Sequence, residues 1–211
     1  MPPNLVQLYH ITHVDNLIGI INNGGLLANC QIQRCSINFK NIAYDGIQDR
    51  RAFTNVPCGP GGTLHDYIPF YFAPRSPMLY TIHRGNVPGY SGGQADIIYI
   101  ISNVNVVVEN SLKYVFTDGH GIMAWSEFYD DLNRLNEVDW GIMNSKYWND
   151  TIDHPDRKRK RQAEFLVYQN MPWNCLTHIA VISPHVKIKV ENSLPVNGHR
   201  PQVLEQPNWY Y

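Results

Sequence analysis

Charged residues are scarce in this sequence, and neither sign predominates. The chain of 211 residues contains 17 Lys or Arg and 18 Asp or Glu, which gives a formal net charge of -1. This balance excludes a uniformly basic surface, so any nucleic-acid partner must be recognised by a local group of residues. Apolar residues make up 44% and charged residues 17% of the chain, a composition that predicts a folded protein with a buried core.

Long hydrophobic runs are also missing. The most apolar stretch, 97–108, is interrupted by Ser102, Asn103 and Asn105, and it is much shorter than the roughly 20 apolar residues that cross a bilayer. The chain begins Met-Pro-Pro-Asn, without a basic segment followed by an apolar one. We therefore expect no membrane partner, no export signal and a cytoplasmic location.

Cysteine is rare, and its spacing does not suggest a metal site. Cys30, Cys35, Cys58 and Cys175 form no C-x-x-C pair and have no H-x-x-x-H nearby, so the usual pattern of a structural zinc site is absent. Cys175 stands in the apolar run 175–182 and is predicted to be a small buried hydrophobe. The sequence predicts no bound metal.

The pattern of apolar residues predicts one α+β domain over residues 1–211. No internal repeat and no linker divides the chain, and the strands alternate with helices in a way typical of a mostly antiparallel sheet with inserted helices. The predicted helices are 14–21, 41–53 and 77–83, and the predicted strands are 5–11, 68–72, 97–101, 164–169, 176–183 and 186–190.

A long polar and aromatic segment, at about 119–163, precedes the strand predicted at 164–169. It carries Trp125, Trp140, Tyr147 and Trp148, and near its end five basic residues follow one another at 157–161. A segment of this length within a compact domain is typical of a functional loop. We expect it to be partly helical and to face the substrate.

Three short segments carry side chains suited to chemistry. Tyr9-His10-Ile11-Thr12 ends a predicted strand, Tyr71 stands in an aromatic strand that leads into a helix, and Glu164 begins an apolar strand. Each has a plain structural alternative. The histidine can be a satisfied strand residue, the tyrosine can fill a core, and the glutamate can be an exposed edge charge.

The order of these segments resembles ADP-ribosyltransferases of the diphtheria-toxin and PARP type, in which the histidine and a hydroxyl hold NAD and the tyrosine stacks on nicotinamide. Four blocks, Tyr-His-Ile-Thr-His-x-x-Asn-Leu, Asp-Arg-Arg-Ala, Tyr-Phe-Ala-Pro-Arg-Ser-Pro-Met-Leu-Tyr and Arg-Gln-Ala-Glu-Phe-Leu, more closely resemble the DarT family of bacterial toxins. The resemblance implies an ADP-ribosyltransferase fold with a split sheet, NAD as co-substrate, thymidine in single-stranded DNA as acceptor, and a DarG-like macrodomain antitoxin as partner.

The resemblance also implies site residues, and the chain departs from the family at none of them. The implied catalytic residues are Arg51 and Glu164. The implied NAD contacts are His10, Ile11, Thr12, Gly19, Leu27, Arg51 and, by stacking, Tyr71.

These residue types suit the reaction. Cleavage of the nicotinamide–ribose bond develops oxocarbenium character, which the Glu164 carboxylate can stabilise while it orients a ribose hydroxyl. Arg51 is a poor base because a guanidinium stays protonated. We expect Arg51 to stabilise an anionic thymine or the NAD phosphates, and Glu164 to be the better proton acceptor.

The basic run at 157–161 is the local feature that could bind DNA phosphates beside Glu164. Nearby aromatic rings could stack on bases. The predicted DNA-binding residues are Arg50, Arg75, Tyr147, Trp148, His154, Arg157, Lys158 and Arg159. The alternative is that the run is simply a solvated loop.

Two other functions stay open at the level of sequence. The His, Tyr and Glu positions concern NAD rather than the acceptor, so the chain could modify protein or RNA. It could also be a non-catalytic module that binds NAD or nucleic acid, although Glu164 argues against this. Nucleotide sites of other types are excluded, because Gly59-Pro60-Gly61-Gly62 lacks the Lys-Ser/Thr of a P-loop and no G-x-G-x-x-G follows a strand.

Overall fold

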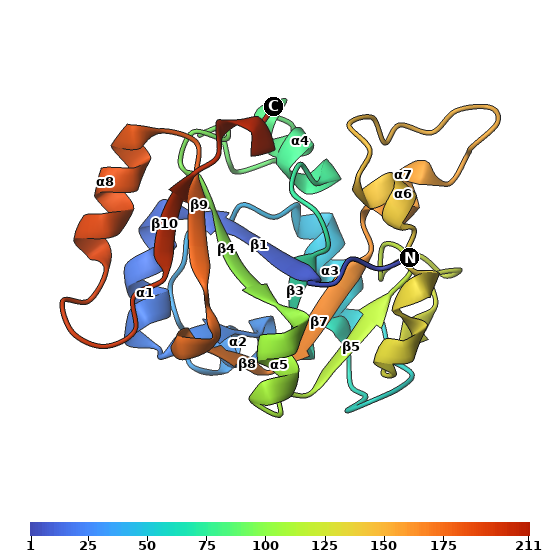
Figure 1. Cartoon of the computed structure of the whole chain (residues 1–211), viewed down its shortest axis with the longest axis horizontal. Helices are drawn as coiled ribbons and strands as arrows, with labels where there is room; N and C mark the ends of the chain where they lie inside the picture. The colour runs from blue at the N-terminus through green and yellow to red at the C-terminus, as the bar shows by residue number, and fades with distance from the viewer.

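The computed structural model describes residues 1–211, and an eight-stranded sheet in the order β10-β9-β4-β1-β3-β7-β5-β6 crosses its centre (Figure 1). Only β9 and β10 pair in parallel, and every other neighbouring pair is antiparallel. A small second sheet pairs β2 with β8. The strands are β1 Gln7–His13, β2 Gly25–Leu27, β3 Tyr67–Tyr71, β4 Ile97–Asn103, β5 Tyr114–Thr117, β6 Phe128–Tyr129, β7 Glu164–Tyr168, β8 Asn170–Pro172, β9 His178–Val181 and β10 Gln202–Glu205.

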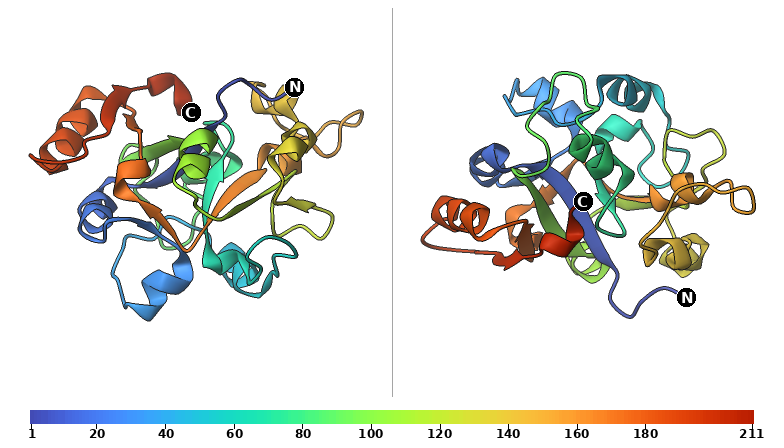
Figure 2. Two further views of the ribbon diagram at one scale, coloured as in Figure 1. Left: turned by 60° about the horizontal axis from the view of Figure 1, so that its bottom comes forward. Right: turned by 90° about the horizontal axis from the view of Figure 1, so that it is seen from above.

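Short helices surround this sheet, which confirms the α+β prediction. The outermost are α8 at one side of the molecule and the α6–α7 pair at the other, and the views in Figure 2 agree on this separation. None of the helices is long and apolar enough to cross a membrane. The α-helices are α1 Leu17–Asn22, α2 Asn29–Arg34, α3 Asp45–Phe53, α4 Pro77–His83, α5 Val104–Glu109, α6 Trp140–Met143, α7 Arg157–Arg161 and α8 Pro184–Ser193; 3-10 helices span Val14–Asn16, Leu64–Asp66, Leu132–Glu137, Trp173–Cys175 and Pro207–Trp209.

Strand β4 is covered on both faces of the sheet. Ile98 and Ile100 belong to the main cluster of 33 buried residues, whereas Tyr99 and Ile101 belong to a second cluster of 11. Successive side chains of a strand point to opposite faces, so each face of β4 contacts its own core. This double burial explains why the sequence of β4 is apolar without alternation. Cys175 is buried in the main cluster, as predicted.

The sheet is weakly joined between β1 and β3. Their pairing is limited to Tyr9 opposite Tyr71, although β1 pairs along its whole length with β4 and β3 pairs along its whole length with β7. Pro69 lies in β3 two residues before Tyr71, and proline has no N–H to donate to a neighbouring strand. The proline therefore favours an interruption of the ladder at this point. The expected split in the sheet lies here.

The strand predicted at 186–190 is wrong, because these residues form the middle of α8. Ser183 accepts a hydrogen bond from the backbone N–H of Val186, and Pro184 occupies the first turn, both of which favour a helix start. Val186 and Val190 are buried at a helical spacing of four residues. The cap and this spacing outweigh the β propensity of the valines.

The segment predicted as a long loop contains β6, α6 and α7, so it is partly helical as expected. Its most extended part, between α6 and α7, projects from the body of the molecule on the side away from α8 (Figures 1 and 2). Two backbone hydrogen bonds between Thr151 and His154 close a tight turn in this part. The segment leads directly into β7 and Glu164.

Candidate active site

Strand register places Tyr9, Tyr71 and Glu164 side by side on three neighbouring strands. Tyr9 lies opposite Tyr71 across β1 and β3, and Tyr71 lies opposite Glu164 across β3 and β7. Residues directly opposite one another in antiparallel strands place their side chains on the same face. Glu164 therefore lies beside Tyr71 and next to the interruption between β1 and β3. The alternative of an exposed edge charge is excluded, because the Glu164 side chain is only 3% exposed.

Two donors bind the buried Glu164 carboxylate. The Arg51 guanidinium donates from Nη1 to Oε1 at 2.7 Å, and the Gly121 backbone N–H donates to Oε2 at 3.2 Å. The backbone of Glu164 is also held, since its N–H donates to the Thr117 hydroxyl at 3.0 Å. These contacts fix the orientation of the carboxylate and balance its charge, as a buried ion needs.

Arg51 reaches Glu164 from α3. Its side chain is 6% exposed, and Nη2 is buried with no partner in the protein. A buried guanidinium N–H without an acceptor lowers the stability of the protein. Nη2 can therefore donate to a ligand atom that lies beside the carboxylate. The neighbouring Arg50 donates to the Ile122 carbonyl at 3.1 Å and joins α3 to the segment that contains Gly121.

Gly121 is required by the close approach of its backbone to Glu164. A Cβ added at this position would lie 2.8 Å from Glu164 Oε2 and 3.3 Å from Leu64 Cδ1. Both contacts are tighter than van der Waals packing allows without a shift of the neighbours. The glycine therefore permits its own N–H to reach the carboxylate.

His10 lies at the interruption between β1 and β3. Its Nδ1 donates to the Pro69 carbonyl at 2.9 Å, because a carbonyl can only accept. Burial lowers the pKa of His10, although the Pro69 carbonyl opposes this shift. The ring is therefore neutral at neutral pH, and its Nε2 carries a lone pair that can accept a hydrogen bond from a ligand hydroxyl.

Tyr71 lies partly buried opposite Glu164. Burial raises its pKa above the usual value, and the negative charge of Glu164 raises it further. The phenol is thus protonated at all physiological pH values and offers an uncharged aromatic ring beside Glu164. A flat apolar ring of this kind suits stacking on a planar heterocycle.

The other predicted NAD residues lie along β1 and the elements that follow it. Thr12 is buried, and its hydroxyl accepts a hydrogen bond from Asn16 at 3.0 Å. Ile11 points into the second hydrophobic cluster, which leaves only its backbone for a ligand. Gly19 lies in α1 with open space around its Cα, and Leu27 ends β2 opposite Asn170.

His120 is a site residue that the sequence analysis missed. Burial lowers its pKa, the Glu164 charge opposes this shift, and the Arg51 charge adds to it. Its backbone is held by the Arg159 carbonyl and by the Ser126 hydroxyl, whereas neither ring nitrogen has a hydrogen-bond partner. The signal in the sequence is Gly119-His120-Gly121, a histidine between two glycines.

Some predicted DNA-binding residues are exposed. Tyr147 is 70% exposed, and Arg50, His154 and Lys158 also lie at the surface. Arg157 is half-buried and donates to the Ser145 hydroxyl at 3.2 Å and to the Tyr147 carbonyl. Their role in binding DNA stays a prediction.

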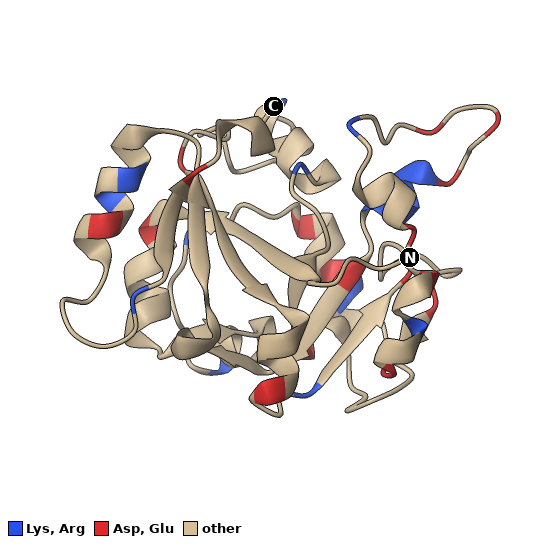
Figure 3. Ribbon diagram, viewed as in Figure 1, with Lys and Arg blue, Asp and Glu red and all other residues tan.

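Two residues of the basic run at 157–161 are bound within the protein, so the run presents fewer than five free charges at the surface. Arg159 is 9% exposed and pairs with Asp118 at 3.0 Å and Asp156 at 2.7 Å. Arg161 is buried and donates to the carbonyls of Ile142, Met143 and Pro74. Figure 3 shows acidic positions close to the basic helix α7.

Two aromatic contacts involve further residues predicted to bind DNA. Trp148 is 7% exposed and donates to the Tyr211 hydroxyl at 2.9 Å, so its ring is not available for stacking on a base. This prediction is wrong because the ring packs in the main core. The Arg75 guanidinium lies 4.5 Å from the centre of the Tyr211 ring, and its Nε is buried without a partner.

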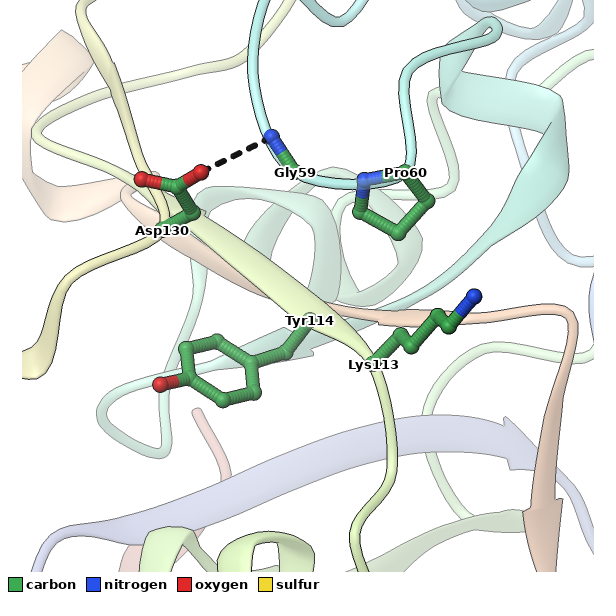
Figure 4. A pocket seen from close by; sticks show the side chains of 5 residues that line it. All are labelled: Gly59, Pro60, Lys113, Tyr114 and Asp130. Carbon is green, nitrogen blue, oxygen red and sulfur yellow. Dashed lines mark hydrogen bonds between the residues drawn. The ribbon is translucent and has the colours of Figure 1, made fainter.

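Figure 4 shows a surface hollow of about 310 Å³. It is lined by Gly59, Pro60, Lys113, Tyr114 and Asp130, and the Gly59 N–H donates to Asp130 at 2.9 Å. This hollow contains none of the predicted site residues. Its position therefore does not support a role in the same reaction.

A sheet that is interrupted beside a histidine, with tyrosine and glutamate on the adjoining strands, places this protein among the NAD-dependent ADP-ribosyltransferases. The family described as "ssDNA thymidine ADP-ribosyltransferase, DarT" matches residues 9–211. The chain therefore belongs to the DarT family, and it is an NAD-dependent DNA ADP-ribosyltransferase.

Individual relatives agree with this assignment. The DNA ADP-ribosyl transferase of Thermus sp. (strain 2.9) is 43% identical over 99% of this chain and 98% of its own length. A structure of Thermus sp. 2.9 DarT with ADP-ribosylated ssDNA superposes with a TM-score of 0.91 at 43% identity, covering 99% of this chain and 98% of that chain. Another, with NAD+, gives 0.89 at 40% identity over all of both chains.

A fusion protein is also related. A DNA ADP-ribosyl transferase-DNA ADP-ribosyl glycohydrolase fusion protein of Thermosipho africanus is 24% identical over all of this chain, which spans 51% of the fusion.

Proposed function

We propose that this chain transfers ADP-ribose from NAD to a ring nitrogen of thymine in single-stranded DNA, with Arg51 and Glu164 as catalytic residues. The observation that carries the proposal is the buried pair of these residues beside Tyr71, in which Arg51 Nη2 still lacks a partner. A buried charge pair with a free donor is suited to a substrate group that becomes negatively charged during reaction.

Glu164 acts on the ribose of NAD. Its carboxylate accepts a hydrogen bond from a ribose hydroxyl and stabilises the positive charge that develops at the anomeric carbon. The bond from that carbon to nicotinamide breaks, and nicotinamide leaves as a neutral base with the electron pair. A new bond then forms from the same carbon to the thymine nitrogen.

His10, Thr12 and Tyr71 position NAD for this step. The His10 Nε2 lone pair accepts from an NAD hydroxyl, the Thr12 hydroxyl donates to NAD, and the Tyr71 ring stacks on nicotinamide. Backbone groups of Ile11, Gly19 and Leu27 complete the contacts. Such positioning lowers the entropic cost of bringing the anomeric carbon to the acceptor.

Attack by thymine requires the loss of its N–H proton. Sequence alone favoured Glu164 as the acceptor of this proton, but its carboxylate is already bound by Arg51 and Gly121. His120 takes this role instead, because its lowered pKa leaves the ring unprotonated at neutral pH and its ring nitrogens have no partner. Arg51 Nη2 then stabilises the anionic base.

Residues 1–211 form a single domain. Within it, the segment 119–163 contributes most of the residues that bind the DNA. Lys158, Arg157 and Arg50 bind phosphates, and Tyr147 and His154 stack on exposed bases. Arg75, which is only partly buried and lies against the Tyr211 ring, also contacts the DNA.

The reversing partner is an ADP-ribosyl glycohydrolase with a macrodomain, which would make this chain the toxin of a toxin–antitoxin pair. The support is that a related transferase is fused to a DNA ADP-ribosyl glycohydrolase in one chain.

The test is incubation of the protein with NAD and single-stranded oligonucleotides that contain either thymine or 3-methylthymine. We expect thymine oligonucleotides to gain the mass of one ADP-ribose, and the methylated ones not to react, because the ring N–H is absent. Glu164→Gln removes the charge with little change in size and should lower transfer by at least about 100-fold. Modification of RNA or protein instead of DNA, or full activity of Glu164→Gln, would contradict the proposal.

A further inference from the structure

The side-chain amide of Asn16 makes three hydrogen bonds, which join Thr12 of the predicted NAD site to the backbone of Lys40. Its Oδ1 accepts from the Lys40 backbone N–H at 2.7 Å, and its Nδ2 donates to the Lys40 carbonyl and to the Thr12 hydroxyl, both at 3.0 Å. Because the Lys40 N–H can only donate and its carbonyl can only accept, the two Lys40 bonds fix which way round the amide lies.

The chain around Lys40 depends on this amide. Residues 37–43 contain no helix or strand and connect α2 to α3. Their hydrogen bonds to β1 and the turn after it are limited to those from Lys40 to Asn16 and Asp15. Asn16 thus satisfies both backbone groups of one residue, in the way that a neighbouring strand would. Nearby, Ile42 packs in the same hydrophobic cluster as Ile11.

The second tether is weaker. The Lys40 ammonium lies 3.5 Å from the Asp15 carboxylate, and both side chains are 49% exposed. An exposed ion pair of this kind contributes little to stability. Asp15 also pairs with Lys189 at 2.7 Å, so its carboxylate has a partner without Lys40.

The bond to Thr12 sets the direction of a hydroxyl proton. Since Asn16 Nδ2 donates, the Thr12 oxygen is the acceptor, and its own proton is free to donate elsewhere. No protein group accepts that proton. Thr12 lies in β1 two residues after His10, so the two side chains share a face of the strand. The free proton is therefore available on the face that carries His10.

We propose that Asn16 is a positioning residue for NAD: its amide holds residues 37–43, and through them the start of α3, against the end of β1, and it leaves the Thr12 proton free for the ligand. The inference rests on the proposed contact between Thr12 and NAD. Asn16 itself does not touch the reacting atoms. It acts through Thr12 and through the segment that leads into the helix of Arg51.

The test compares Asn16→Asp with Lys40→Met. Asn16→Asp keeps the acceptor for the Lys40 N–H but loses both donor bonds, and its carboxylate draws the Thr12 proton away from the ligand. Lys40→Met removes the exposed ammonium and keeps both backbone bonds. Each variant is measured for the KM of NAD, for kcat with a single-stranded thymine oligonucleotide, and for amide hydrogen exchange in residues 37–43.

For Asn16→Asp we expect the KM of NAD to rise about 5- to 20-fold, as the loss of one or two hydrogen bonds predicts, with kcat changed less than threefold. Exchange in residues 37–43 should become faster. Lys40→Met should resemble the unchanged protein, and Thr12→Val should raise KM without faster exchange. Unchanged exchange in Asn16→Asp overturns the role in holding the segment, and an unchanged KM overturns the role in NAD binding. Failure of the unsubstituted protein to bind NAD would instead contradict the proposed function.

Discussion

Arg51 Nη1 lies 2.7 Å from Glu164 Oε1, although 113 residues separate them in the chain. Both side chains are almost fully buried, so each charge depends on the other. Removing one partner of such a pair leaves an unpaired buried charge and typically costs about 3–5 kcal/mol.

Arg51→Met should therefore lower the free energy of unfolding by roughly that amount, and the double variant Arg51→Met/Glu164→Gln should recover most of it. Both variants should lose transfer activity. Urea denaturation and an oligonucleotide transfer assay measure the two effects. Activity in the stable double variant would show that the pair is structural only.

Gly121→Ala should reduce transfer much more than stability. The new methyl group would lie 2.8 Å from Glu164 Oε2, so the carboxylate must move or the backbone N–H must withdraw from it. We expect a loss of stability of about 1–3 kcal/mol and a fall in activity of at least about tenfold. Gly141→Ala is the control, because its added Cβ would contact only Asp139 at 3.2 Å in a different part of the segment. Equal effects of the two substitutions on transfer would argue against the role of Gly121.

Tyr147 and Trp148 are neighbours in the chain, but their substitution by alanine should affect different properties. Trp148→Ala removes a ring from the main core and should lower the free energy of unfolding by about 3–5 kcal/mol. Tyr147→Ala changes an exposed side chain and should change stability by less than about 0.5 kcal/mol. If Tyr147 stacks on a base, its loss should weaken binding of single-stranded DNA by about 1–3 kcal/mol. Thermal unfolding and fluorescence anisotropy separate the two outcomes, and unchanged DNA affinity in Tyr147→Ala would exclude the stacking role.

Substitutions of the neighbouring residues Lys158 and Arg159 should also have different effects, one on DNA affinity and the other on stability. Lys158 is exposed, so Lys158→Ala should reduce DNA affinity and lower the slope of log K against log salt by about one. Arg159→Ala breaks the partly buried ion pairs with Asp118 and Asp156 and should lower stability. Lys187→Ala in α8, on the opposite side of the molecule, is the control for Lys158→Ala. An unchanged salt slope would remove Lys158 from the phosphate contacts.

His10 and His120, both partly buried, should make the protein sensitive to acid. Burial lowers the pKa of His10 and of His120 below the usual 6.5, so the unfolded chain binds protons more readily than the folded one. The contribution of these two histidines to the free energy of unfolding is complete above pH 6.5. It is lost as the pH falls from 6.5 through their lower pKa values in the folded state. The slope is at most about 1.4 kcal/mol per pH unit for each histidine. Urea denaturation between pH 7.5 and 5.0 measures this loss, and His10→Gln should make it smaller. Equal slopes in the two proteins would contradict the contribution of His10.

Much of the architecture follows from local sequence patterns. The apolar runs that become β3, β4 and β7 are short and bounded by polar or glycine-rich segments, and α4 begins with Ser76 as a cap followed by Pro77. The strand prediction for 186–190 is wrong because the β-branched residues suggest a strand, whereas Ser183, Pro184 and burial against the sheet favour a helix. Propensity is a weak signal when capping and packing oppose it.

The order of His10, Tyr71 and Glu164 along the chain, and the resemblance that this order carries, were sufficient to identify the family and the NAD-dependent reaction. Residue types at these positions determine which chemistry is possible. The pairing of Arg51 with Glu164, the donor from Gly121 and the proximity of His120 come from segments far apart in the sequence, so only the folded chain brings them together. Neighbouring residues of the same kind also differ in solvent exposure. Lys158 and Tyr147 lie at the surface, whereas the side chains of Arg159 and Trp148 are buried. Sequence specifies the side chains, but solvent exposure and distance depend on the packing of the whole chain.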